Sequence, residues 1–157
     1  QPWLRRIVVD EPDGGRIAYA TPLQSDSIAW SCTKPPSRDP RVEALRHSPE
    51  GEVLDWFASR ELWSELAPRV DGGETVRLYD RRYGVPGDTN NGWWGIEAAF
   101  AADGGMISFP TRFSLPRPPV GDNIRELFRA ALGEPTPLFP QASDPSAAAA
   151  DCARQRG

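Results

Sequence analysis

The chain has 157 residues, a length that fits one domain burying roughly 70% of the surface of its unfolded chain. Its formal net charge of -4 at pH 7 argues against nucleic acid as a partner, because such binding needs a basic face that displaces phosphate counterions. No stretch reaches the ~20 apolar residues that a membrane-spanning helix needs, so we expect no transmembrane segment in the chain as given.

The chain begins at Gln1 rather than at a methionine, and the residues that follow lead directly into a strand. We therefore expect that a leader or a preceding segment has been removed. Cys32 and Cys152 are the only cysteines. A disulfide between them stays an open alternative, but unpaired thiols are favoured because Cys152 lies in a tail with little to bury.

Three segments near the start of the chain predict an antiparallel meander. Apolar and polar residues alternate with a period of two in "RRIVVD" (5–10), "RIAYA" (16–20) and "DSIAWSC" (26–32), as in half-buried strands. The Asp-Gly-Gly sequence at 13–15 predicts a hairpin turn between the first two strands. Ile28, Trp30 and Cys32 would share one side of the third strand, which makes Cys32 a small core residue.

The next segment predicts two short helices in tandem. Asp39 before Pro40, and Ser48 before Pro49, each pair an N-cap residue with a proline suited to the first helical turn. In the second segment, "EGEVLDWFASREL" (50–62), the residues Val53, Trp56, Phe57 and Arg60 share one helical face. We expect that face to pack on the protein, with Asp55 and the other carboxylates on the solvated side.

Two further strand pairs and a terminal helix follow. "PRVDGGETVRLYD" (68–80) and "WWGIEAAFAADGGMISFPTRF" (93–113) each contain an Asp-Gly-Gly turn between strand patterns. In "DNIRELFRAALGE" (122–134), Asn123 with Glu126 predicts a capping box, and Gly133 predicts the C-terminal end. The apolar stripe of this helix consists of Ile124, Leu127, Phe128, Ala131 and Leu132.

These elements together predict an α+β fold. We expect a twisted antiparallel β-sheet with short helices packed on one side and a C-terminal helix, forming a single domain over residues 1–133. Residues 134–157 are rich in Pro, Ser and Ala, so we expect an extended or disordered C-terminal tail that serves as a linker or lies along a partner.

Asp80 and Arg82 are the first candidate site. They lie two residues apart at the end of a strand pattern, so their side chains share one face and can meet. A carboxylate held ionised beside a guanidinium suits a structural ion pair better than a general acid, and we favour the structural interpretation. His47 is the only histidine, and its position at a helix end favours capping over catalysis.

Trp93 and Trp94 are candidates for an interface. They follow a turn sequence, "GDTNNG", and adjacent strand residues point to opposite faces of a sheet. One ring would therefore pack in the core while the other faces solvent or a partner. Trp63 is a third candidate interface residue. A carbohydrate or small-ligand module that stacks its ligand on Trp93 and Trp94 is an alternative.

The sequence contains no complete catalytic constellation. A single histidine excludes multi-histidine metal sites, and the carboxylates around 50–61 match the solvated face of an amphipathic helix. The glycine pairs each follow aspartate in hairpin patterns rather than linking a strand to a helix as phosphate-binding loops do. We therefore expect no catalytic residue, no metal and no cofactor in this chain.

The order of "SRDPRVEALRHSPEGEVLDWFA" (37–58) and "VRLYDRRYG" (76–84) resembles the soluble C-terminal region of bacterial membrane-bound metal-dependent hydrolases, a family of inner-membrane proteins. In that family a "WF" helix precedes a strand ending in an Asp-Leu-Arg-Tyr-Gly-like motif. The matching residues here are Trp56, Phe57, Asp80, Arg82, Tyr83 and Gly84, and Arg81 stands where leucine is usual. The resemblance covers residues 3 to about 115.

The resemblance implies a domain at a bacterial membrane surface, on a side that it does not fix. The histidine-bearing membrane helices of the family have no counterpart in this chain, so the hydrolase activity is not carried over. Our leading hypothesis is a non-catalytic accessory or assembly domain that binds a membrane protein or membrane complex. The alternative is the soluble C-terminal part of such a hydrolase, with its catalytic residues upstream.

Overall fold

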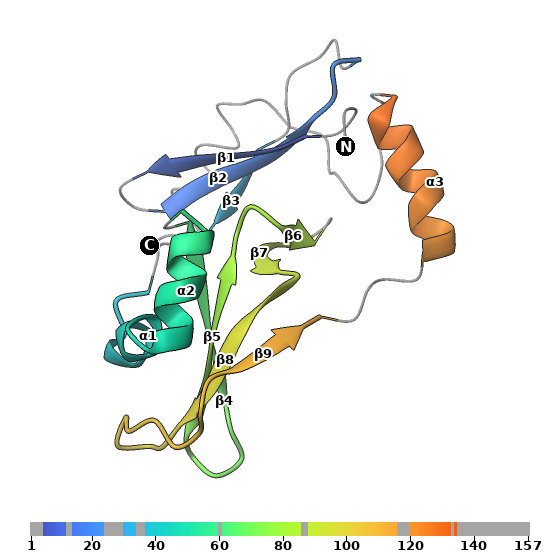
Figure 1. Ribbon diagram of the computed structural model, residues 1–157. Helices are drawn as coiled ribbons and strands as arrows, with labels where there is room; N and C mark the ends of the chain where they lie inside the picture. The colour runs from blue at the N-terminus through green and yellow to red at the C-terminus, as the bar shows by residue number, and fades with distance from the viewer. Residues whose placement is uncertain are drawn as a thin grey trace. The chain divides into compact units, whose positions relative to one another are not determined.

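The computed structural model describes residues 5–11, 14–23, 30–33, 37–59, 61–85, 88–115, 120–132 and 134, and its fold is α+β, as the sequence predicted (Figure 1). The chain divides into two compact units, which are described separately. The first unit comprises Gln1–Pro35, Pro86–Asn90 and Pro116–Gly157, and the second comprises Pro36–Val85 and Asn91–Leu115. The single domain expected over 1–133 stays a prediction, and the tail beyond Glu134 lies outside the described residues.

The first unit contains the predicted meander. Strands β1 (Arg5–Glu11), β2 (Gly14–Ala20) and β3 (Trp30–Thr33) are antiparallel and lie in the order β1-β2-β3. Ala18 pairs with Ile7 on one side and with Trp30 on the other, which fixes the register of all three strands. The expected third strand began at 26, but residues 26–29 lie outside the described part of the chain.

Two expectations for the first unit were wrong. Cys32 is disulfide-bonded, not an unpaired thiol, and the only other cysteine, Cys152, lies outside the described residues. Helix α3 (Val120–Ala131) begins before Asn123, so this residue is inside the helix and is not its N-cap. At the other end of α3, the hydroxyl of Thr21 donates a 2.7 Å hydrogen bond to the carbonyl oxygen of Ala131. Carbonyl groups in the last turn of a helix have no donor within the helix, so Thr21 supplies one.

The second unit is built on a four-stranded antiparallel sheet. Strands β4 (Leu62–Pro68), β5 (Glu74–Asp80), β8 (Trp94–Phe100) and β9 (Thr111–Ser114) lie in the order β4-β5-β8-β9. Elsewhere in the chain, strands β6 (Gly84–Val85) and β7 (Asp88–Gly92) form a separate two-stranded ribbon. Gly72 (φ 82°) and Gly104 (φ 88°) adopt the left-handed conformation that the predicted Asp-Gly-Gly turns require.

Helices α1 (Pro40–Arg46) and α2 (Pro49–Phe57) begin as predicted. The Asp39 carboxylate accepts a hydrogen bond from the backbone N–H of Arg41, and the Ser48 hydroxyl accepts one from that of Gly51. The end of α2 was predicted wrongly, because the helix stops at Phe57 and Leu62 already belongs to β4. Ser59 takes a left-handed φ of 52°, which ends the helix and turns the chain into the strand.

The helices and the sheet of the second unit enclose one apolar core. Both helices pack on β5 and β8. The face of the sheet toward them carries the alternating residues of the central strands, including Val76, Leu78, Ile96 and Phe100, which are buried. The core cluster consists of Val42, Leu45, Leu54, Val76, Leu78, Ile96, Ala98 and Phe100.

Helix α2 buries a different face from the one we expected. Leu54 and Gly51 are buried, whereas Val53 and Trp56 are exposed by 67% and 82%. Gly51 explains why α2 is rotated about its axis relative to our expectation. A Cβ at this position would lie 2.1 Å from the carbonyl oxygen of Leu45. Only glycine lets α2 approach the end of α1 so closely, and this contact turns the aromatic side of α2 outward.

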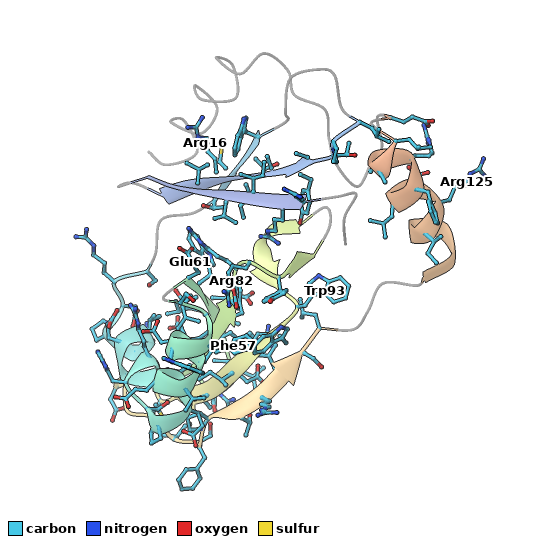
Figure 2. The ribbon with its side chains drawn as sticks, turned by 45° about the horizontal axis from the view of Figure 1, so that its top comes forward. Arg16, Phe57, Glu61, Arg82, Trp93 and Arg125 are labelled. Atoms are coloured by element: carbon cyan, nitrogen blue, oxygen red, sulfur yellow. The ribbon has the colours of Figure 1, made fainter. Side chains whose placement is uncertain are left out.

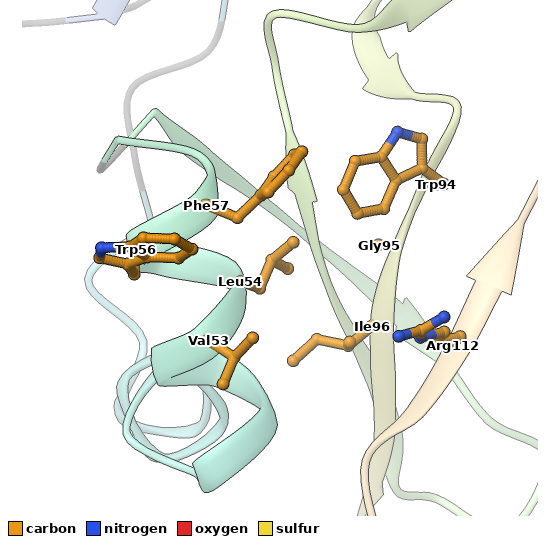
Figure 3. A pocket seen from close by; sticks show the side chains of 8 residues that line it. All are labelled: Val53, Leu54, Trp56, Phe57, Trp94, Gly95, Ile96 and Arg112. Carbon is orange, nitrogen blue, oxygen red and sulfur yellow. The ribbon is translucent and has the colours of Figure 1, made fainter.

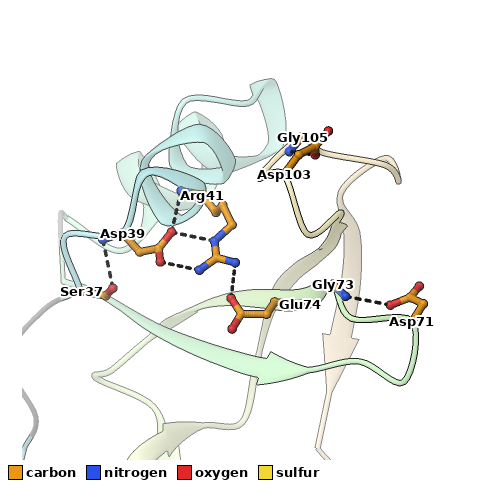
Figure 4. A network of polar contacts seen from close by, with 8 residues as sticks. All are labelled: Ser37, Asp39, Arg41, Asp71, Gly73, Glu74, Asp103 and Gly105. Carbon is orange, nitrogen blue, oxygen red and sulfur yellow. Dashed lines mark hydrogen bonds and ion pairs between the residues drawn. The ribbon is translucent and has the colours of Figure 1, made fainter.

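A polar network fastens the start of α1 to the sheet (Figure 4). The guanidinium of Arg41 donates to both carboxylate oxygens of Asp39, at 2.8 and 2.6 Å, and forms an ion pair with Glu74 at the start of β5. The hydrogen bond from Arg41 lowers the pKa of Asp39 from 3.8 to about 2. Asp39 is therefore both the helix cap and one end of an ion-pair bridge.

We expect Gly51→Ala to destabilise the second unit by about 1–3 kcal/mol, the usual cost of overpacking. Helix propensity alone predicts the opposite sign, since alanine normally stabilises a helix interior by roughly 0.5–1 kcal/mol over glycine. The change in the free energy of unfolding, measured by urea denaturation, shows whether overpacking or helix propensity dominates. Gly105→Ala is the control, because its Cβ would meet only a side-chain oxygen of Asp103, at 3.3 Å. A stabilised Gly51→Ala variant would contradict the close approach of α1 and α2.

We expect part of the stability to be lost in acid because the pKa of Asp39 is lowered on folding. A lowered carboxyl pKa stabilises the fold above the unfolded value, and this contribution disappears as the pH falls from about 4 to about 2. Asp39→Asn keeps an N-cap acceptor but cannot ionise, so it should flatten this part of the pH profile. Asp39→Ala should lower the free energy of unfolding by about 1 kcal/mol more than Asp39→Asn does, because it also removes the N-cap acceptor. An unchanged profile for Asp39→Asn, measured by urea denaturation from pH 2 to 7, would refute the assignment.

Candidate functional site

Asp80 and Arg82, the sequence-predicted pair, meet at the end of β5. The Asp80 carboxylate is fully buried, and Arg82 donates to it from Nε at 2.9 and 3.0 Å and from Nη2 at 2.5 Å. The backbone N–H of Arg82 donates a further hydrogen bond of 2.9 Å to Asp80 Oδ1. Hydrogen bonding to Asp80 raises the pKa of Arg82, so this guanidinium stays charged throughout the physiological range.

Arg82 also reaches the end of α2, which no pattern in the sequence indicated. Its Nη2 donates a 2.8 Å hydrogen bond to the carbonyl oxygen of Phe57, one of the groups left open where the helix stops. The guanidinium lies beside Phe57 (Figure 2), 5.8 Å from its ring centroid, and 5.6 Å from the ring centroid of Tyr83, both within cation–π range. We call Asp80, Arg82 and the Phe57 carbonyl the Arg82 network.

The other two arginines of "VRLYDRR" have their own carboxylates. Arg81 is buried, pairs with Glu61 at 2.6 Å, and lies 5.5 Å from the ring centroid of Trp63. Arg77 forms ion pairs across the sheet with Glu97 at 2.8 Å and with Glu65 at 3.4 Å. The charge cluster that stood out in the sequence therefore consists of matched pairs that join neighbouring elements.

A pocket of about 360 Å³ lies beside the Arg82 network, between α2 and β8 (Figure 3). Leu54 and Ile96 are buried at its base, and Trp56 and Val53 stand at its rim. Phe57 and Trp94 close one end, with ring centroids 5.5 Å apart in an edge-to-face arrangement. The residues of this α2–β8 pocket are Val53, Leu54, Trp56, Phe57, Trp94, Gly95, Ile96 and Arg112.

The candidate interface tryptophans lie in different surroundings. Trp94 is half-buried in the pocket wall, and its ring also lies 6.3 Å from that of Tyr83. Trp93 is half-buried and outside the strand (Figure 2). Its backbone N–H donates to the carbonyl oxygen of Tyr83 at 3.0 Å. Trp63 is buried. The structure thus places Trp94 alone of the three in the pocket.

His47 caps the end of α1. Its backbone N–H donates to the carbonyl oxygen of Glu43, and its exposed imidazole lies 3.6 Å from the carboxylate of the same residue.

Within the described part of the chain, no group of three His, Cys, Asp or Glu side chains could hold a metal ion. In the same part, no helix is long and apolar enough to cross a bilayer.

Sequence reasoning missed Trp56 and Val53 as exposed pocket residues. Their spacing with Phe57 matches an amphipathic core-facing stripe, so the pattern by itself assigned them to the interior. Gly51 was the available signal, because a glycine inside a short helix often marks a close approach of another backbone. With Gly51 and Leu54 facing inward, the larger side chains at 53 and 56 must face outward.

Comparison with known proteins gave no match: no family model, no curated protein and no solved structure is significantly similar to this chain. The resemblance noted in the sequence therefore stays a prediction.

We expect Arg82→Ala to lower the free energy of unfolding by about 3 kcal/mol, the lower end for breaking a buried ion pair, since Arg82 is partly exposed. Arg69→Ala is a matched control. Arg69 and Arg82 are equally exposed, at 36%, and each binds an aspartate two residues away, but Asp71 is 47% exposed whereas Asp80 is 0% exposed. Arg69→Ala should leave urea denaturation unchanged, because exposed ion pairs contribute little. Equal losses of unfolding free energy in the two variants would mean that the burial of Asp80 does not cause the destabilisation.

Proposed function

We propose that this chain is a non-catalytic accessory or assembly domain that works at a bacterial membrane surface through contacts with a membrane protein or membrane complex. The observation that carries the proposal is the outward face of α2, where Val53, Trp56 and Phe57 are exposed beside a complete apolar core. Soluble proteins rarely expose large contiguous apolar surface without a partner for it. Tryptophan is also enriched at the centre of protein interfaces.

The role of the charged residues supports a binding function. Asp80, Arg82, Arg81 and Glu61 bind one another or neighbouring backbone, at distances of 2.5 to 2.8 Å. Such pairs hold neighbouring elements of the unit in place. The rigid unit that results can present an aromatic surface with little loss of conformational entropy on binding.

A second candidate function is the soluble C-terminal part of a membrane-bound metal-dependent hydrolase, with the catalytic residues upstream. One observation favours it: Phe57, Asp80, Arg82 and Tyr83, which carry the resemblance, contact one another in the structure. Membrane helices rich in histidine, encoded directly before Gln1 in the same reading frame, would support this candidate. Their absence from the reading frame would remove it.

The first proposal predicts that native membranes contain a partner that copurifies with this chain in stoichiometric amount. Trp56→Asp should weaken the retention of that partner by about tenfold or more, as loss of a central interface residue does. The control is Val70→Asp, because Val70 is also fully exposed but lies in the turn between β4 and β5. Affinity purification in mild detergent with quantitative mass spectrometry measures both. A partner retained equally by the two variants, or no membrane partner at all, would overturn the proposal.

A further inference from the structure

The α2–β8 pocket combines apolar walls with one positively charged side chain. Val53, Phe57 and Ile96 line it with apolar surface, and the side chain of Arg112 approaches from β9 (Figure 3). Arg112 pairs with Ile96 in the register of β8 and β9, so it lies on the same face of the sheet as the pocket. The site therefore presents a positive charge at the edge of an apolar cavity.

Arg112 differs from the arginines around it. Arg77 and Arg82 are held by carboxylates at 2.5 to 2.8 Å, whereas Arg112 is exposed and its side chain forms no ion pair or hydrogen bond within the described part of the chain. An exposed guanidinium at the rim of an apolar site favours a ligand with a carboxylate at that position, because charge complementarity selects partners and speeds their association. A planar guanidinium can also bind a carboxylate through two parallel hydrogen bonds.

The size and the rim of the pocket indicate the kind of ligand. A volume of about 360 Å³ is at the lower end for small-molecule sites and accommodates one or two bulky side chains. A small ligand inside it would leave Trp56, which is 82% exposed, uncovered on the outer side of α2. A polypeptide segment can fill the pocket with one side chain and cover Trp56 with its neighbours, as peptides do in apolar grooves.

We propose that the α2–β8 pocket binds a segment of a partner protein in which a bulky apolar side chain lies next to an aspartate or glutamate. The apolar side chain occupies the space between Phe57, Trp94 and Ile96, and the carboxylate pairs with Arg112. This inference rests on the proposed function and adds the chemistry of the partner to it.

A random peptide library displayed on phage tests the inference with the whole chain as bait. Selection on the wild-type protein should enrich peptides with an aromatic or branched apolar residue beside Asp or Glu. Selection on Arg112→Glu should enrich Lys or Arg beside the same apolar residue. A peptide selected on the wild type should lose about tenfold in affinity for Arg112→Glu, since attraction at the rim becomes repulsion.

Arg69→Glu is the control for net charge. Arg69 lies in the turn after β4, outside the pocket, and the substitution makes the same change in charge. It should leave the selected sequences and the affinity unchanged. The same enrichment on wild type and on Arg112→Glu would overturn the inference, as would the absence of any enriched apolar–acidic pattern.

The test separates this inference from the proposed function. Charge-dependent peptide binding without a copurifying membrane partner would support the pocket chemistry and overturn the membrane role. A membrane partner that is lost in Trp56→Asp but bound fully by Arg112→Glu would support the proposed function and overturn the pocket chemistry.

Discussion

The second unit depends on the neutralisation of one buried charge. The Asp80 carboxylate is removed from water, and an isolated ion in that position would cost several kcal/mol. Arg82 supplies the countercharge from two residues further along the chain, with nearly ideal two-point geometry. Because the same guanidinium binds the carbonyl oxygen of Phe57, the charge pair also fixes where α2 ends on the sheet.

The pocket follows from this constraint. With the end of α2 held at the end of β5, Phe57 meets Trp94 of β8 edge to face, and Leu54 and Ile96 close the base beneath them. Gly51 determines which side of the helix points outward, since it lets α2 approach α1 and leaves Trp56 at the surface. A structural ion pair and a structural glycine thus shape a surface that neither of them lines.

The residues that could be predicted from sequence are those whose role is local. Caps at Asp39 and Ser48, positive-φ glycines in the Asp-Gly-Gly turns, and alternation along β8 depend on a few neighbouring residues, and the α+β fold followed from them. The pairing of Asp80 with Arg82 is local in the same sense. The exposure of Trp56, the hydrogen bond from Arg82 to Phe57 and the position of Arg112 depend on contacts between distant segments. Helical periodicity describes the spacing of apolar residues on α2 but does not determine which face of the helix packs on the sheet.

The buried Asp80–Arg82 pair is therefore linked to the α2–β8 pocket through the end of α2. Native-state hydrogen exchange in the Arg82→Ala variant measures that link most directly, because it reports local opening amide by amide. In this variant we predict the largest loss of protection at Ala58, whose N–H donates to the carbonyl oxygen of Leu54 in the last turn of α2. Leu78 and Ile96 in the central strands should lose only the protection that the lower global stability removes. Uniform loss of protection across α2 and the strands, or unchanged exchange at Ala58, would contradict it.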